Sequence, residues 1–221
     1  MTIAKLDERQ CILFDLDGTL VDTVKDITGA MNQALTHFNL PLVRESQIRV
    51  WVGEGSEKLC RTVLASMECT FISPEVLCAY YLKYYEKDFC IYSGIFSGVI
   101  EFLEVCRARH LKMACVTNKP KLLAIKILTQ LNLIQYFPLV IGGDSLSEKK
   151  PSPMPLLYAI ENFAIQSKHV LMIGDSKNDI KAARAAQIDC IIMSYGYNHG
   201  ESIYDSHPQE VIDNLTQLLN N

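Results

Sequence analysis

Five short stretches of nearly continuous apolar residues are spread along the chain, and each ends at or just before a polar residue or a glycine. They are CILFD (11–15), MACVT (113–117), LVIGG (139–143), VLMIGD (170–175) and CIIM (190–193). Strands that are covered on both faces of a parallel sheet have this pattern. Between the later stretches, Pro120 and Pro155 open helical stripes, and Ile180, Ala183 and Ala186 mark a third. The alternation predicts an α/β fold with a doubly wound, Rossmann-like parallel sheet core.

The interval between the first and second apolar stretches is much longer than a crossover requires, and its pattern is helical. Ile27, Met31 and Leu35 belong to one apolar stripe, and a second helix is expected over 58–67. The tripeptide Ser73-Pro74-Glu75 is a strong helix start. We therefore expect a helical cap at 21–90, inserted after the first strand, and a core built from 1–20 and 91–221.

Three further patterns near these elements are interpreted as packing. The tyrosines of YYLKYY (80–85) follow the helix start at Ser73 and are assigned to the core of the cap, as is Trp51, the only tryptophan. A last helix is expected around Val211, Leu215 and Leu218, where apolar residues recur at helical spacing.

Composition and charge exclude several classes of protein. Of the 221 residues, 49% are hydrophobic and 21% are charged, as in a globular protein with a sizeable core. The net charge is −4 and the basic residues are scattered, so we expect no nucleic-acid partner. No apolar run approaches the ~20 residues of a membrane helix, and MTIAKLDERQ lacks an apolar signal segment. We expect a cytoplasmic protein without a membrane partner.

The cysteines and histidines do not indicate a metal centre of the zinc type. None of the eight cysteines has CxxC spacing, and most lie within apolar stretches, which is typical of buried free thiols. The five histidines show no paired spacing.

Polar side chains collect at the ends of the predicted strands. Asp15 and Asp17 close the first strand, Thr117 closes the second, Lys150 follows the third, and Asp175 closes the fourth. Ligands of open α/β sheets bind beyond the carboxyl ends of the strands, so these residues are expected to converge. Three carboxylates at one point repel each other unless a cation lies between them, and a set of oxygen ligands suits Mg²⁺.

Four motifs occur in order at these strand ends. They are DLDGT (15–19), Thr117 in VTN, Lys150 before Pro151, and GDSKND (174–179). Together they resemble the haloacid dehalogenase-like superfamily over essentially the whole chain, and the interval at 21–90 resembles the helical cap of that superfamily.

The resemblance implies a chemical role for each carboxylate. Asp15 would attack phosphorus and form an aspartyl-phosphate. Asp17 would protonate the leaving alcohol and then take a proton from water. Mg²⁺ would be held by Asp175, an Asp15 carboxylate oxygen and the main-chain carbonyl of Asp17. Asp179 would orient metal-bound water or Lys150 from outside the ligand set.

The resemblance also implies a set of phosphate contacts. We assign them to Gly18, Thr19, Thr117, Asn118 and Lys150. Gly18 allows the tight turn that brings main-chain groups close to the phosphate, and Lys150 is favoured over Lys149 because it stands directly before Pro151.

Asp17 also restricts the reaction class. Members of the superfamily that cleave carbon–halogen or carbon–phosphorus bonds lack this acid, so a phosphatase is favoured over both. A phosphomutase and a non-catalytic binding protein are the remaining alternatives. Segments 49–59, 116–120 and 142–157 resemble bacterial phosphoglycolate phosphatases, which implies a small phosphorylated metabolite as the partner. Sugar phosphates, pyrophosphate and nucleoside monophosphates stay open as substrates, and the chain is expected to be a monomer or homodimer.

Gly53, Gly55 and Lys58 are the candidate specificity residues of the cap. Their GxG is not a dinucleotide fingerprint, because Lys58 stands where the third glycine would be. We expect a flexible loop that faces the active site and presents Lys58 to the carboxylate of the substrate. The alternative interpretation is an ordinary turn at a helix start.

Overall fold

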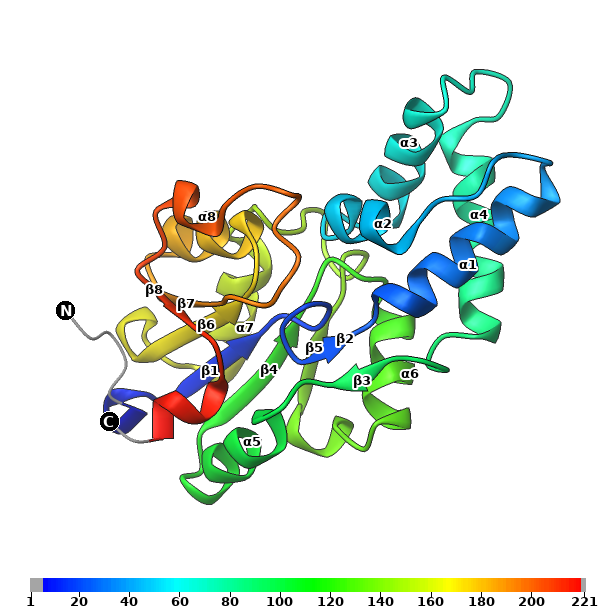
Figure 1. The fold of residues 1–221 in the computed structure, drawn as a ribbon. Coiled ribbons are helices and arrows are strands. Elements are labelled where there is room, and N and C mark those ends of the chain that lie inside the picture. Colours follow the sequence, from blue (N-terminus) through cyan, green and yellow to red (C-terminus); the bar gives the residue numbers. More distant parts are fainter. Residues whose placement is uncertain (1–5, 220–221) are drawn as a thin grey trace.

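The computed structural model describes residues 6–219 and has a parallel six-stranded sheet at its centre (Figure 1). The first residues of the N-terminal stretch and the last two residues of the predicted core lie outside this range. The strand order is β5-β4-β1-β6-β7-β8, and every neighbouring pair is parallel. The strands are β1 (Cys11–Phe14), β4 (Lys112–Val116), β5 (Leu139–Ile141), β6 (Val170–Gly174), β7 (Asp189–Met193) and β8 (Glu210–Ile212).

Helices cover both faces of the sheet, which explains the continuous hydrophobicity of its strands. In β1, Ile12 and Phe14 belong to one core cluster, and Cys11 and Leu13 belong to the other. Each side chain of the strand is fully buried, because successive residues point to opposite faces and both faces are packed. The predicted α/β fold with a doubly wound parallel sheet is confirmed.

Four helices cover the two faces of the sheet. α5 (Val99–Ala108) and α6 (Lys121–Gln130) pack with the cluster that contains Phe14, and α7 (Met154–Phe163) and α8 (Lys177–Ala186) pack with the cluster that contains Leu13. Pro120 precedes α6 and Pro155 lies in the first turn of α7, where its missing N–H costs no helical hydrogen bond.

The interval after β1 forms a separate group of helices beside the carboxyl end of the sheet (Figure 1). The group contains α1 (Val24–His37), α2 (Glu45–Trp51), α3 (Ser56–Ser66) and α4 (Pro74–Lys87). The Ser73 hydroxyl accepts a hydrogen bond from the N–H of Val76, so the predicted start of α4 is confirmed. Between this group and the core, β2 (Val21–Asp22) and β3 (Gly94–Ile95) form a short antiparallel ribbon that the sequence pattern did not predict. The division at 21–90 remains a prediction.

The predicted C-terminal helix is wrong. Val211 lies in β8, which extends the sheet by one edge strand, and Leu215 and Leu218 lie in a 3-10 helix at Leu215–Leu219. Asn214 interrupts the pattern, because its side-chain oxygen accepts hydrogen bonds from the N–H and the hydroxyl of Thr216 and so starts a new element. The three-residue spacing of the two leucines suits one face of a 3-10 helix as well as an α-helix.

Several short 3-10 helices lie between the main elements, and none of the cysteines forms a disulfide among the described residues. Further 3-10 helices are Leu6–Glu8, Ile134–Tyr136, Ser167–His169 and Ile203–Ser206. All eight cysteines are free thiols, and five of them are buried. Within residues 6–219, none of the helices combines the length and apolar character needed to cross a membrane.

Candidate active site

The strand order explains why side chains far apart in the sequence meet at one place. β4, β1 and β6 are neighbours, and Phe14 of β1 pairs with Cys115 of β4 and Ile173 of β6. Residues just after these pairs therefore emerge side by side at the carboxyl edge of the sheet. A pocket at this edge is lined by Asp15, Asp17, Thr117 and Asp175, among others.

Asp15 is fixed by the turn that follows β1 and by a buried cation. Its N–H continues the sheet by donating to the Ile173 carbonyl over 2.9 Å, and its Oδ1 accepts from the N–H of Leu16 over 2.7 Å. The other carboxylate oxygen lies 3.0 Å from Nζ of Lys150. Burial raises the pKa of Asp15 to about 6, with Lys150 opposing the shift and Asp179 adding to it. One carboxylate oxygen is thus held in position near the pocket.

Lys150 uses all three of its N–H donors inside the protein. They reach the Val116 carbonyl at 2.7 Å, Asp179 at 2.7 Å and Asp15 at 3.0 Å, and the side chain is only 1% exposed. Burial by itself lowers the pKa of Lys150, but the charges of Asp15 and Asp179 outweigh it and raise the pKa. The structure therefore places Lys150 as the partner of the two carboxylates rather than in direct reach of a phosphate group. Lys149 has no such contacts among the described residues.

Asp179 joins Lys150 to the start of α8. Its Oδ2 accepts from the N–H groups of Asp175 and Ser176 and from the Ser176 hydroxyl, which forms a capping box. Its Oδ1 accepts from Lys150. The fully buried carboxylate has a partner for each oxygen, which is what burial of a charge requires.

Asp175 is held from two sides by groups of the core. Its Oδ1 accepts from the Thr19 hydroxyl at 2.9 Å, and its Oδ2 accepts from the N–H of Tyr197 at 2.6 Å. Gly18 packs directly against it with φ +85°, and a Cβ at this residue would lie 2.3 Å from the carboxylate. The N–H of Gly18 donates to the Val21 carbonyl. In this conformation Gly18 and Thr19 position Asp175, whereas the sequence assigned both to the phosphate.

The carboxylates of Asp15, Asp175 and Asp179 form a cluster that fits a hard cation. One oxygen from each lies within 4.8 Å of the others. Burial, and then the charges of Asp15 and Asp179, raise the pKa of Asp175 well above its usual range. A divalent cation with oxygen ligands would relieve this repulsion. Asp15 and Asp175 line the pocket and Asp179 does not, so Asp15 and Asp175 are the carboxylates of the cluster that a cation in the pocket could reach.

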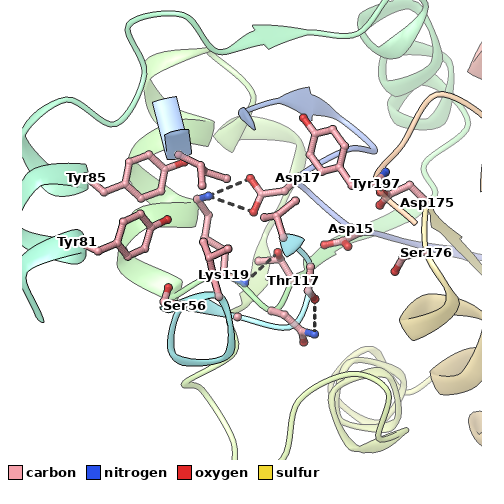
Figure 2. A pocket seen from close by; sticks show the side chains of 16 residues that line it. Asp15, Asp17, Ser56, Tyr81, Tyr85, Thr117, Lys119, Asp175, Ser176 and Tyr197 are labelled. Carbon is pink, nitrogen blue, oxygen red and sulfur yellow. Dashed lines mark hydrogen bonds and ion pairs between the residues drawn. The ribbon is translucent and has the colours of Figure 1, made fainter. Parts of the chain in front are cut away.

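Asp17 lines the pocket and contacts Lys119. Nζ of Lys119 lies 2.9 and 3.0 Å from the two Asp17 carboxylate oxygens, and the Thr23 hydroxyl donates to one of them at 2.6 Å. Figure 2 shows Lys119 between Asp17 and the rings of Tyr81 and Tyr85. The Asp17 carboxylate is therefore not part of the acidic cluster, which agrees with its assignment as an acid and base rather than a carboxylate ligand of the metal.

Thr117 and Asn118 follow β4 and line the same pocket. The Thr117 hydroxyl accepts from the N–H of Lys119 at 3.2 Å. The Asn118 side-chain amide donates to the carbonyls of Gly53 and Lys150, at 3.0 and 2.8 Å, so it is not directed to a phosphate in this conformation. Its buried Oδ1 has no hydrogen-bond partner, which leaves a polar atom available to a bound group.

The cap contributes the other wall of the pocket, but only two of its three candidate specificity residues lie in that wall. Gly53, Gly55 and Ser56 line it, together with Tyr81 and Tyr85 from α4. Lys58 is exposed on α3 and does not line it. The space left between cap and core is about 30 Å³, room for about two water molecules.

A family model now identifies the chain. The model described as haloacid dehalogenase-like hydrolase matches residues 12–193, which includes all four strand-end motifs. The chain belongs to the haloacid dehalogenase-like hydrolase family.

Similar proteins within this family share almost the full length. The chain is 41% identical to a phosphoglycolate phosphatase of Nitrosococcus oceani and 39% identical to one of Colwellia psychrerythraea, with 97% of each chain covered in both cases. It superimposes on the crystal structure of a predicted phosphoglycolate phosphatase from Haemophilus somnus with a TM-score of 0.92 and 33% identity, covering 96% of this chain and 97% of that one. The predicted resemblance and the enzyme class, a hydrolase of the phosphatase type, are confirmed.

Three residues that line the pocket of this haloacid dehalogenase-like enzyme were not assigned to the site from the sequence. Lys119 follows Asn118 at a strand end, so the rule that ligands gather there could have found it. Tyr81 and Tyr85 were assigned to packing, and their spacing of four residues on α4 does place them on one face. That face borders the pocket, which only the position of the cap determines.

Proposed function

We propose that the chain is a Mg²⁺-dependent phosphatase that forms an aspartyl-phosphate on Asp15 and acts on 2-phosphoglycolate. The observation that carries the proposal is the placement of two carboxylates in one pocket with different partners. Asp15 lies beside Lys150 and the acidic cluster, and Asp17 lies beside Lys119 and Thr23, outside that cluster. Two carboxyl groups in unlike surroundings suit a nucleophile and an acid.

In the first step, an Asp15 oxygen forms a bond to phosphorus and the bond from phosphorus to the ester oxygen breaks. The electron pair stays on that oxygen, which takes a proton from the carboxylic acid of Asp17. In the second step, water attacks phosphorus, gives a proton to Asp17, and displaces the Asp15 carboxylate.

The other residues of the core keep Asp15 and Asp175 in place. Lys150 and the N–H of Leu16 fix the Asp15 carboxylate, and Asp179 fixes Lys150 in turn. Asp15, Asp175 and the main-chain carbonyl of Asp17 would hold Mg²⁺. When bound, the cation offsets the negative charge that the carboxylates and a phosphate bring together.

Support for 2-phosphoglycolate comes from two sources. Relatives that share 41% and 39% identity over 97% of this chain are named phosphoglycolate phosphatase. The pocket is small when the cap lies against the core, and the cap side is closed by aromatic rings. A short leaving group fits such a space better than a sugar or a nucleoside.

A substrate panel tests the proposal. The purified enzyme would be assayed for phosphate release from 2-phosphoglycolate, pyrophosphate, a hexose phosphate and a nucleoside monophosphate, with Mg²⁺ and after EDTA treatment. We expect the highest kcat/KM on 2-phosphoglycolate and no turnover after EDTA. A preference for another substrate would overturn the assignment of phosphoglycolate, and absence of turnover on every substrate with Mg²⁺ would overturn the phosphatase.

A further inference from the structure

We propose that Lys119 and Tyr85 hold the carboxylate of the leaving group and so determine the specificity for short phosphorylated acids. The inference rests on the proposed function, because it names the groups that would recognise the acid part of 2-phosphoglycolate. It also replaces Lys58, the residue that the sequence favoured for this role.

The first observation is the charge of the pocket wall. Of the described residues that line the pocket, Lys119 is the only one with a positive charge. Its side chain is 3% exposed, and its Nζ is bonded to one carboxylate, Asp17. Lys150 is also buried, but its three donors are already used. Lys119 is therefore the cation that an anionic leaving group can reach.

The second observation is a buried hydroxyl without a partner. Tyr85 is 1% exposed, its Oη has no hydrogen-bond partner, and its ring lies beneath Nζ of Lys119 at 4.6 Å from the ring centre. A buried hydroxyl that makes no hydrogen bond costs free energy, so such groups are rare unless a ligand completes them. The two side chains point into the same part of the pocket (Figure 2).

The cap adds a third group to this subsite. α3 begins at Ser56 after Gly55, and both residues line the pocket, so the N-terminus of an 11-residue helix borders the same space. Free main-chain N–H groups and the helix dipole favour an anion there. Lys119, Tyr85 and this helix start come from three separate segments, and all three favour one carboxylate.

The distance between the acid and the cation matches the length of the substrate. Asp17 must contact the ester oxygen that leaves, and Nζ of Lys119 lies 2.9 Å from Asp17. In 2-phosphoglycolate a single CH₂ separates the ester oxygen from the carboxylate. A leaving group protonated by Asp17 therefore brings its carboxylate to Lys119, whereas a longer acid would be stopped by the rings of Tyr81 and Tyr85.

The test compares two substrates of equal length on three variants. The substrates are 2-phosphoglycolate and 2-hydroxyethyl phosphate, which has an uncharged hydroxymethyl group in place of the carboxylate. The ratio of interest is kcat/KM on 2-phosphoglycolate divided by kcat/KM on 2-hydroxyethyl phosphate. We expect Lys119→Met to lower this ratio by about ten- to a hundred-fold, because it removes a charged partner, and Tyr85→Phe to lower it by about two- to ten-fold, because it removes a neutral hydroxyl. Lys58→Met, which changes an exposed cation of α3, is the matched control and should leave the ratio unchanged.

Tyr85→Phe also separates recognition from folding. Since the hydroxyl has no partner in the free protein, its removal should leave Tm unchanged or raise it while the ratio falls. Equal losses on both substrates for Lys119→Met, or a ratio that falls only with Lys58→Met, would overturn the inference. The proposed function would then still stand, because it depends on turnover of 2-phosphoglycolate by the wild-type enzyme in the same assay.

Discussion

At the scale of single residues, several ionisable side chains of this enzyme are almost completely buried, and they form ion pairs or hydrogen bonds with other buried groups. Lys150 is the clearest case, because it sits between Asp15 and Asp179 with 1% of its side chain exposed. Replacing one member of such a set leaves the others buried and unpaired, which costs more than the set contributes when complete.

We expect Lys150→Met to destabilise the fold by about 3–5 kcal/mol and to abolish turnover. Lys149→Met is the matched control, because the neighbouring lysine has no ion pair among the described residues and should change stability by less than about 0.5 kcal/mol. Urea unfolding of both variants measures the difference. Equal stability of the two variants would contradict the structural role of Lys150.

Asp17→Asn should slow the second chemical step more than the first when the leaving group is a good one. Loss of general base assistance is worth on the order of a hundred- to ten-thousand-fold. The aspartyl-phosphate should then accumulate with p-nitrophenyl phosphate, and borohydride reduction followed by mass spectrometry would detect homoserine at residue 15. Asp15→Asn is the control and should give no adduct. Absence of the adduct in both variants, with turnover retained, would contradict the covalent route.

At the scale of elements, one carbonyl joins the cap to the core. The Gly53 carbonyl accepts from the side-chain amides of Asn118, after β4, and Asn178, in the first turn of α8, at 3.0 and 3.3 Å. Two segments of the core thus hold the loop that precedes α3. The free space in the pocket is about 30 Å³, so we expect these contacts to open when a substrate enters.

Asn178→Ala should weaken the closed arrangement without touching the reacting groups. We expect KM for 2-phosphoglycolate to rise by about two- to ten-fold, the value of one neutral hydrogen bond, and hydrogen exchange at 52–56 to become faster. Lys177→Ala, at the neighbouring residue of α8, removes an ion pair with Glu201 and is the control. Unchanged exchange at 52–56 in the Asn178 variant would show that this contact does not hold the cap.

At the scale of the whole molecule, the carboxylate cluster proposed to bind Mg²⁺ lies where β1 and β6 end. A ligand that binds only the folded state stabilises it by RT ln(1 + [L]/Kd), about 2.7 kcal/mol at a hundred times Kd. The stability of the molecule is therefore expected to depend on Mg²⁺.

Addition of Mg²⁺ should raise the Tm of the wild-type enzyme and should not raise that of Asp175→Asn. Without Mg²⁺ the variant should be at least as stable as the wild type, since it removes one of three clustered carboxylates. Asp205→Asn, which changes an exposed aspartate, should keep the full response. Thermal unfolding followed by circular dichroism gives these values. A similar Mg²⁺ response in both aspartate variants would place the cation elsewhere.

The sequence by itself determined the parts of this enzyme that depend on the pattern of apolar and polar residues within short segments. Apolar stretches predicted five of the six strands of the sheet, and each strand ends close to its predicted residue. Since the carboxyl ends of parallel strands share one edge, the expectation of a parallel sheet was enough to predict that Asp15, Asp17, Thr117 and Asp175 lie near one another, and all four line one pocket. The edge strand at Val211 could not be found in this way, because three apolar residues at helical spacing also fit a strand followed by a 3-10 turn.

The tertiary structure decided which of several similar side chains face the pocket. Lys58 and Lys119 carry the same charge, yet one is exposed on α3 and the other is buried between Asp17 and Tyr85. Thr19 was expected to contact the phosphate, but its hydroxyl is bonded to Asp175. The physical reason is the same in each case. Burial and hydrogen-bond partners come from segments a hundred or more residues away, and no local pattern records how the cap lies on the core.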